Sequence, residues 1–127
     1  MVQADIAQLT GECGTWRETL RLYRDELTQH KTRLQQAAGQ PLSKTQLQEV
    51  EHLHNQFHIQ LINIHDLKHA VKLHDRKLHS EVSGNSNGQF ADNISAYHEN
   101  LYDNYQSLEN TLGELRNEVS LFVSTVH

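Results

Sequence analysis

Residues 94–126 read ISAYHENLYDNYQSLENTLGELRNEVSLFVSTV, and this stretch decides the fold. Its apolar side chains recur at alternating intervals of four and three residues, the repeat of a helix that buries one stripe in a bundle. The stripe consists of Ile94, His98, Leu101, Tyr105, Leu108, Leu112, Leu115, Val119, Phe122 and Val126. A strand would alternate at every second residue, which this stretch does not do. The pattern therefore predicts one long amphipathic helix.

The same repeat runs through two further stretches of the chain. The first has the stripe Ile6, Leu9, Cys13, Trp16, Leu20, Tyr23, Leu27, His30, Leu34 and Ala37. The second has the stripe Leu47, Val50, His54, Phe57, Leu61, Ile64, Lys68, Val71, Asp75, Leu78 and Val82. Its polar gaps are covered by a neighbouring stripe, Leu53, Phe57, Ile64, Leu67, Val71, His74 and Leu78. So wide an apolar band predicts a middle helix that contacts two neighbours.

Two breaks separate the three stretches. Gly39 is expected to end the first helix in the left-handed conformation, and Pro41 prevents the helix from continuing. Ser43 followed by Gln46 predicts a capping box that opens the second helix. The polar segment 83–89 contains no apolar residue and predicts the second loop.

These signals predict an all-α fold, a single domain over residues 1–127. It is expected to be an up-down-up three-helix antiparallel left-handed coiled-coil bundle with long helices. The helices are expected at about 5–38, 43–82 and 90–125, with loops at 39–42 and 83–89. Gly11 and Gly14 each disfavour a helix by about 1 kcal/mol relative to alanine. An alternative start for the first helix is therefore Thr15, which can form a second capping box with Glu18.

Charge and hydropathy argue against several classes of protein. The chain of 127 residues has a formal net charge of -5 with its histidines neutral. No segment has the basic footprint that nucleic acid or an anionic membrane surface requires. No run approaches the roughly 18 apolar residues of a membrane span, and the first ten residues do not resemble a secretory signal. We therefore expect a cytoplasmic protein that binds neither nucleic acid nor membrane.

The ten histidines are unusual for a chain of this length, and seven of them lie between His52 and His79. One flank of the middle helix combines four of them with two apolar residues, namely His54, His58, Ile62, His65, His69 and Leu73. A flank that met only solvent would not need the apolar Ile62 and Leu73. We therefore predict that this flank is an interface, either in a homodimer or with a protein partner.

Two histidine pairs on this flank also permit an alternative, a metal-binding helical bundle. His54 with His58, and His65 with His69, are four residues apart and can chelate one divalent ion from one helix face. The leading prediction includes no metal and no other cofactor. Cys13 falls on an apolar stripe, as a small core residue does. Because no phosphate loop or nucleophile–base pattern occurs, we predict no catalytic residue and expect a protein that is not an enzyme.

Two further histidines occupy core positions, where a buried polar group usually finds a hydrogen-bond partner and sets the register of packing. These are His30 and His98. Because the loop at 83–89 folds the third helix back on the second, His98 and His74 are expected at a similar height in the bundle.

Overall fold

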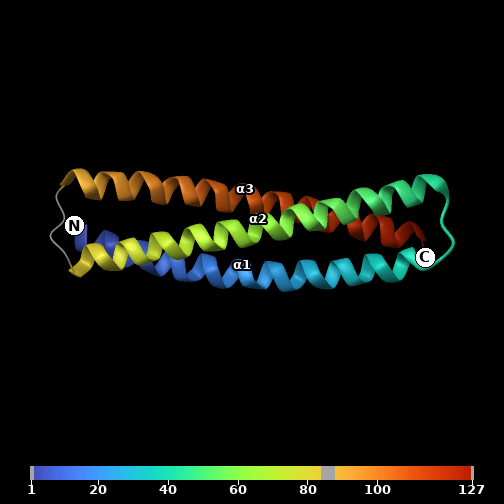
Figure 1. Ribbon diagram of the computed structural model, residues 1–127, viewed down its shortest axis with the longest axis horizontal. Coiled ribbons are helices and arrows are strands. Elements are labelled where there is room, and N and C mark those ends of the chain that lie inside the picture. Colours follow the sequence, from blue (N-terminus) through green and yellow to red (C-terminus); the bar gives the residue numbers. More distant parts are fainter. Residues whose placement is uncertain (1, 84–87, 127) are drawn as a thin grey trace.

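Three long helices form the molecule. The computed structural model describes residues 2–83 and 88–126, and the side chains of residues 7–80 and 94–126. Helix α1 spans Val2–Ala38, α2 spans Lys44–Ser83 and α3 spans Gly88–Val126. The chain reverses direction between successive helices, which lie along one long axis (Figure 1). The predicted all-α three-helix bundle is confirmed, whereas the coiled-coil packing and its left hand stay predictions.

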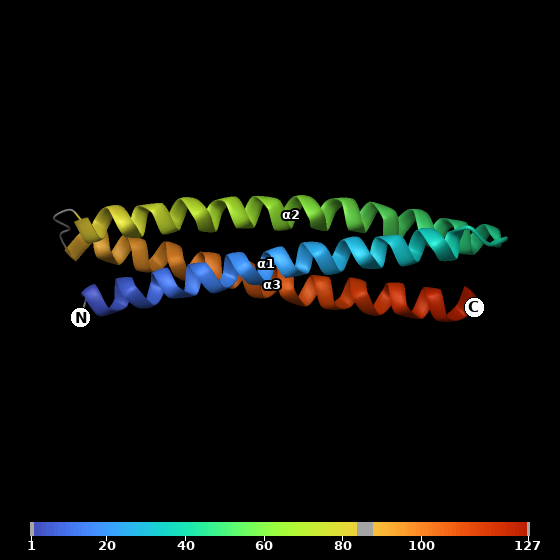
Figure 2. The same cartoon turned by 90° about the horizontal axis from the view of Figure 1, so that it is seen from below.

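Helix α2 lies against both other helices along the bundle (Figures 1 and 2). One ion pair at the surface joins each pair of helices. The three are Arg17–Asp75 at 3.4 Å between α1 and α2, His52–Glu118 at 3.6 Å between α2 and α3, and Arg116–Glu26 at 3.1 Å between α1 and α3. Such exposed pairs contribute little to stability, about 0–1 kcal/mol each. Burial of the apolar stripes is therefore the main source of cohesion.

The stripes predicted for the first and third helices form most of the core. In α3 the whole series from Ile94 to Phe122 is buried, and Val126 packs partly buried against it. In α1 the buried members are Cys13, Trp16, Leu20, Leu27, Leu34 and Ala37, with Leu9 and Tyr23 partly buried. The side chain of Ile6 lies outside the described residues.

In α2 the whole neighbouring stripe faces the core, whereas the first stripe does so only at the residues that the two stripes share. The neighbouring stripe's members Leu53, Phe57, Ile64, Leu67, Val71, His74 and Leu78 are all buried. The prediction that the first stripe is buried is wrong at Leu47, which is 54% exposed. Leu61, another residue of that stripe, is only partly buried. The polar Gln60 fills a core position, where its Oε1 accepts a hydrogen bond from Asn63 at 3.1 Å. The side chain of Val82 is not among those described.

The turn between α1 and α2 confirms one predicted signal and corrects another. The capping box is formed, since the Ser43 N–H donates to Gln46 Oε1 at 2.8 Å and the Gln46 N–H donates to Ser43 Oγ at 3.2 Å. No described glycine has a positive φ, so the left-handed ending at Gly39 is wrong. Instead the Gly39 N–H donates to the Gln36 carbonyl at 3.2 Å, which tightens the last turn of α1.

Helix α1 is continuous through Gly11 and Gly14, so the alternative start at Thr15 is wrong. The Thr15 hydroxyl donates to the Gly11 carbonyl at 3.1 Å, a contact found inside helices and not at their caps. At the second connection, Ser83 belongs to α2 and Gly88 to α3, while residues 84–87 of the predicted loop lie outside the described part. Over the described residues, no helix is long and apolar enough to cross a bilayer.

The core assignment predicts different effects of truncation at two nearby leucines of α1. Leu20 is fully buried, whereas Leu22 is 55% exposed. Leu20→Ala should lower the free energy of unfolding by about 2–5 kcal/mol because it leaves a cavity. Leu22→Ala should change it by less than about 0.5 kcal/mol. Urea unfolding followed by circular dichroism measures both, and equal effects would contradict the assignment.

Candidate functional site

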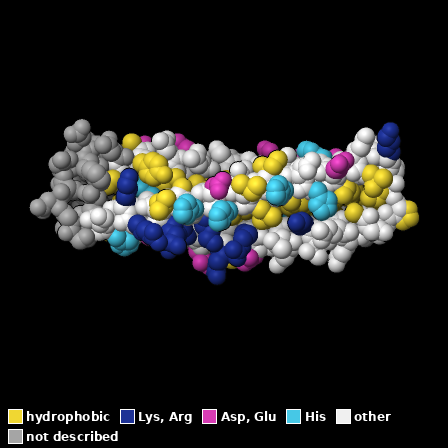
Figure 3. Space-filling model, viewed as in Figure 1, with side chains coloured by type: hydrophobic (Ala, Val, Ile, Leu, Met, Phe, Trp, Pro, Cys, Tyr) yellow, Lys and Arg dark blue, Asp and Glu magenta, His cyan; other side chains and the backbone are white. Residues whose placement is uncertain are grey.

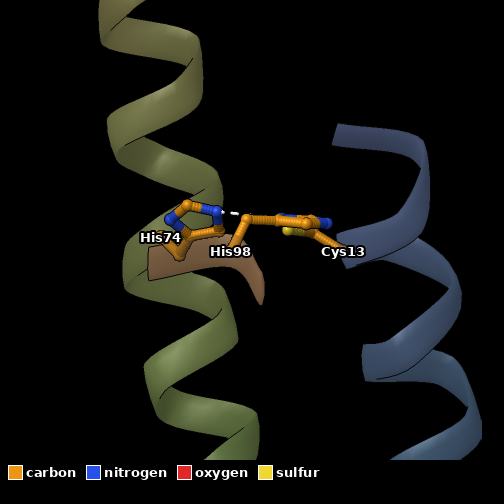
Figure 4. Close-up of side chains that lie close together, drawn as sticks. All are labelled: Cys13, His74 and His98. Atoms are coloured by element: carbon orange, nitrogen blue, oxygen red, sulfur yellow. Dashed lines mark hydrogen bonds between the residues drawn. The ribbon is translucent and has the colours of Figure 1, made fainter. Parts of the chain in front are cut away.

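A group of chemically active side chains lies inside the core, where the three helices meet. Cys13 from α1, His74 from α2 and His98 from α3 point toward one another (Figure 4). Their exposed fractions are 0%, 1% and 5%, respectively. One potential ligand atom from each residue lies within 4.8 Å of the other two. In the described part of the chain, no other set of three or more His, Cys, Asp or Glu side chains converges in this way.

A chain of hydrogen bonds passes through this cluster and connects all three helices. His98 Nε2 lies 2.7 Å from Glu12 Oε1, and His98 Nδ1 lies 3.0 Å from His74 Nε2. Because a carboxylate can only accept, the proton of His98 is placed on Nε2. Its Nδ1 then accepts from the Nε2–H of His74. The predictions that His98 is buried with a partner, and that it meets His74 at one height, are confirmed.

Aromatic rings close the cluster against water. The indole of Trp16 stacks on the His98 ring with a centroid distance of 4.6 Å. Tyr105 and Tyr102 stack on the same indole at 5.7 and 5.8 Å. Tyr97 meets the His74 ring edge-on at 5.2 Å. These ring contacts cover His98 and His74 and explain why the two polar side chains are buried.

Burial determines the protonation of the cluster. Burial and, to a smaller extent, the neighbouring His98 together lower the pKa of His74 to about 4. Burial also raises the pKa of the Cys13 thiol to about 12, and the charge of Asp75 adds to this rise. In the protein without a bound ion, His74 is therefore neutral and Cys13 is a thiol at neutral pH. A buried thiol of this kind is a poor nucleophile, as the sequence predicted for a small core residue.

His30, the other histidine on a predicted core stripe, is largely buried, with 14% of its side chain exposed. Its Nε2 lies 3.4 Å from Glu26 Oε1, while its Nδ1 has no hydrogen-bond partner among the described residues. His30 therefore lies mostly within the bundle, with Glu26 as its polar partner and the rim of its ring reaching solvent.

The histidine flank predicted from the sequence lies on the outer side of α2, and we call the six residues His54, His58, Ile62, His65, His69 and Leu73 the histidine face. His58, His65 and His69 are exposed, and His54 is half-buried. Ile62 and Leu73 are 47% and 46% exposed. Figure 3 shows histidine side chains in a row on this side of the molecule, with Lys and Arg gathered beside part of the row. No third ligand joins either histidine pair in the described residues.

Comparison with known proteins finds no matching family, no similar curated protein and no similar solved structure. The functional argument therefore rests on the residues themselves. Sequence reasoning placed Cys13, His74 and His98 on apolar stripes but did not bring the cysteine to the histidines. The available signal was that all three are chemically active residues at core positions.

The lowered pKa of His74 predicts that the bundle is less stable in mild acid. A depressed pKa means that the unfolded state binds more protons between about pH 6.5 and pH 4, so stability is lost as the pH falls through this window. From pH 7.5 to pH 5.5, protonation of this one group in the unfolded state should lower the free energy of unfolding by about 1 kcal/mol. Urea unfolding in the presence of a chelator measures the change.

The matched variants are His74→Phe, which cannot be protonated, and His58→Gln, which removes an exposed histidine. The pH dependence should shrink in the first and persist in the second. An unfolding midpoint that is the same at both pH values in the unmodified protein would contradict the burial of a neutral His74.

Proposed function

We propose that the protein is a non-enzymatic helical bundle that self-associates through the histidine face of α2, as an antiparallel homodimer. The observation that carries this proposal is the exposure of large apolar side chains on that side of the helix. Ile59, Ile62 and Leu73 are each 44–47% exposed, and Ile59 lies one turn before Ile62. Burying such side chains against a second copy is favourable by roughly 25 cal/mol per Å² of apolar surface.

The charge distribution along α2 supports an antiparallel arrangement of two copies. The first half of the helix carries the acids Glu49 and Glu51 and one base, for a net charge of -1, whereas the second half carries four bases and three acids, for a net charge of +1. The bases of the second half are Lys68, Lys72, Arg76 and Lys77, and its acids are Asp66, Asp75 and Glu81. Glu51 and Lys72 are exposed and lie nearly equally far from Ile62 on either side. When two α2 helices pair in opposite directions about Ile62, the acidic half of each copy faces the basic half of the other. A parallel pair would place like charges together.

A basic groove beside the histidine face supports the same arrangement. It measures about 420 Å³, lies between α1 and α2, and is lined by Arg17, His65, Lys68, His69 and Lys72. No acidic residue lines it. Acidic side chains from the first half of a second α2 would therefore meet complementary charge there.

The chemistry of the remaining residues supports a role without catalysis. The one cysteine is a buried thiol, and the exposed histidines lie along a helix surface and not in a cleft with a nucleophile. Chelation of metal by His54 with His58, or by His65 with His69, is not favoured because each pair offers only two ligands.

Light scattering coupled to size-exclusion chromatography at micromolar concentration tests the dimer. The unmodified protein should have twice the mass of the chain, and Ile62→Glu should be a monomer because it places two charges at the centre of the interface. Leu121→Glu is the matched control, since Leu121 is 68% exposed on α3. A monomeric unmodified protein, or equal effects of the two variants, would overturn the proposal.

A charge swap tests the antiparallel register. Glu51→Lys and Lys72→Glu should each weaken the dimer, because each places like charges opposite one another across the interface. Combining both changes in one chain should restore association, since the pair is re-formed with its signs exchanged. If the double variant is as weak as the single ones, these two residues do not face each other.

A further inference from the structure

We propose that Cys13, His74 and His98 form a buried binding site for a divalent transition-metal ion, zinc being the ion that fits best. The site lies in the bundle core, none of its three ligands belongs to the histidine face, and its argument does not depend on the proposed dimer. Its function would be structural, since an ion held by three helices stabilises their packing.

The donor atoms suit zinc more than the hard cations. One thiolate sulfur and two imidazole nitrogens are ligands that Zn²⁺ prefers, whereas Mg²⁺ and Ca²⁺ prefer oxygen. Two nitrogens bound to one tetrahedral zinc lie about 3.3 Å apart, given Zn–N bonds of about 2.0–2.1 Å. His74 Nε2 and His98 Nδ1 already face each other at 3.0 Å. With all three ligand atoms within 4.8 Å of one another, small side-chain shifts complete the set.

Glu12 supports the site from outside the ligand set. It accepts the Nε2–H of His98 at 2.7 Å, which leaves Nδ1 free to bind the ion. A carboxylate that orients a ligand histidine through its second nitrogen is a recurring feature of zinc sites. The charges also balance, because one Zn²⁺ is neutralised by the Cys13 thiolate together with the Glu12 carboxylate. Such neutrality reduces the cost of placing an ion in the core.

The second nitrogen of the His74 ring can take up the proton that an ion would displace. The Nδ1 atom of His74 has no hydrogen-bond partner among the described residues, although this side chain is only 1% exposed. When zinc takes the place of the proton on Nε2, that proton can move to Nδ1, where no other group competes for the atom.

Binding has a simple proton balance and a route from the surface. A zinc–sulfur bond replaces the S–H bond of Cys13, and the proton passes to the solvent. The two histidines stay neutral throughout. A groove of about 480 Å³, lined in part by Leu73, Lys77 and Tyr97, borders His74, so an ion can reach the cluster where the Tyr97 ring moves aside.

Titration with Co²⁺, a spectroscopic substitute for zinc, tests the proposal on full-length protein purified without a histidine tag or chelating resin. The expected result is one ion per chain, with a sulfur-to-cobalt absorption band and a raised melting temperature. Competition by Zn²⁺ should abolish the band. Cys13→Ser and Cys13→Ala should both lose the band and the stabilisation, and circular dichroism in a chelator confirms that each variant is folded.

Two further variants separate the core site from binding at the surface. Glu12→Gln should weaken the affinity about ten- to a hundredfold while keeping the sulfur band, as loss of an orienting carboxylate does. The double variant His65→Gln/His69→Gln should bind as the unmodified protein does. Cobalt that binds without a sulfur band, or a stabilisation that survives in both folded Cys13 variants, would overturn the proposal and assign the metal to surface histidines.

Discussion

The hydrogen-bonded chain from Glu12 through His98 to His74 is the constraint that fixes how the three helices are aligned. Apolar stripes alone would allow one helix to slide along another. After a shift by one heptad, about 10 Å along a helix, leucines would again pack against leucines. The hydrogen bonds from Glu12 to His98 and from His98 to His74 do not allow such a shift. A displaced helix would leave His74 or His98 buried without a partner, at a cost of about 1–3 kcal/mol for each group. One level of the bundle thus determines the alignment of the rest.

The aromatic residues around this level make the constraint effective. Trp16 covers the face of His98, and the tyrosines packed on it keep water from competing for the hydrogen bonds. In a dry environment, a hydrogen bond is stronger and its loss costs more. The same residue type therefore has opposite roles on α2. His74 points inward as a neutral, structural group, while His58, His65 and His69 remain solvated on the outer side.

The sequence predicted the helices and their stripes well where the stripe was narrow. In α1 and α3 a single apolar series was present, so burial could be assigned residue by residue. In α2 the apolar band was wide enough to contain two series, and the choice between Leu47–Leu61 and Leu53–Leu67 depends on where the neighbouring helices lie. No local signal carries that information. The capping box at Ser43 was predictable because it depends on contacts between residues three apart.

The core cluster was harder to predict because it needs the axial position of α1. A first helix beginning at Thr15 would have left Cys13 outside it, whereas a helix beginning at Val2 carries both Glu12 and Cys13 into the bundle. The meeting of His74 with His98 required only the hairpin between α2 and α3, which the sequence showed. The prediction of a left-handed ending at Gly39 was also wrong. A helix can end either in a tight last turn or in a left-handed residue, and the sequence at Gly39 does not distinguish the two.

The most direct test of the account is the protonation of the two core histidines, measured by long-range ¹H–¹⁵N NMR of the rings near neutral pH in the presence of a chelator. The hydrogen-bond chain predicts that His74 is neutral and that His74 and His98 each carry a proton on Nε2. It also predicts slow exchange of these protons with water, in contrast to the exposed His58. A charged His74 ring, or rings that exchange rapidly between tautomers as a solvated histidine does, would contradict the claim that this chain aligns the helices.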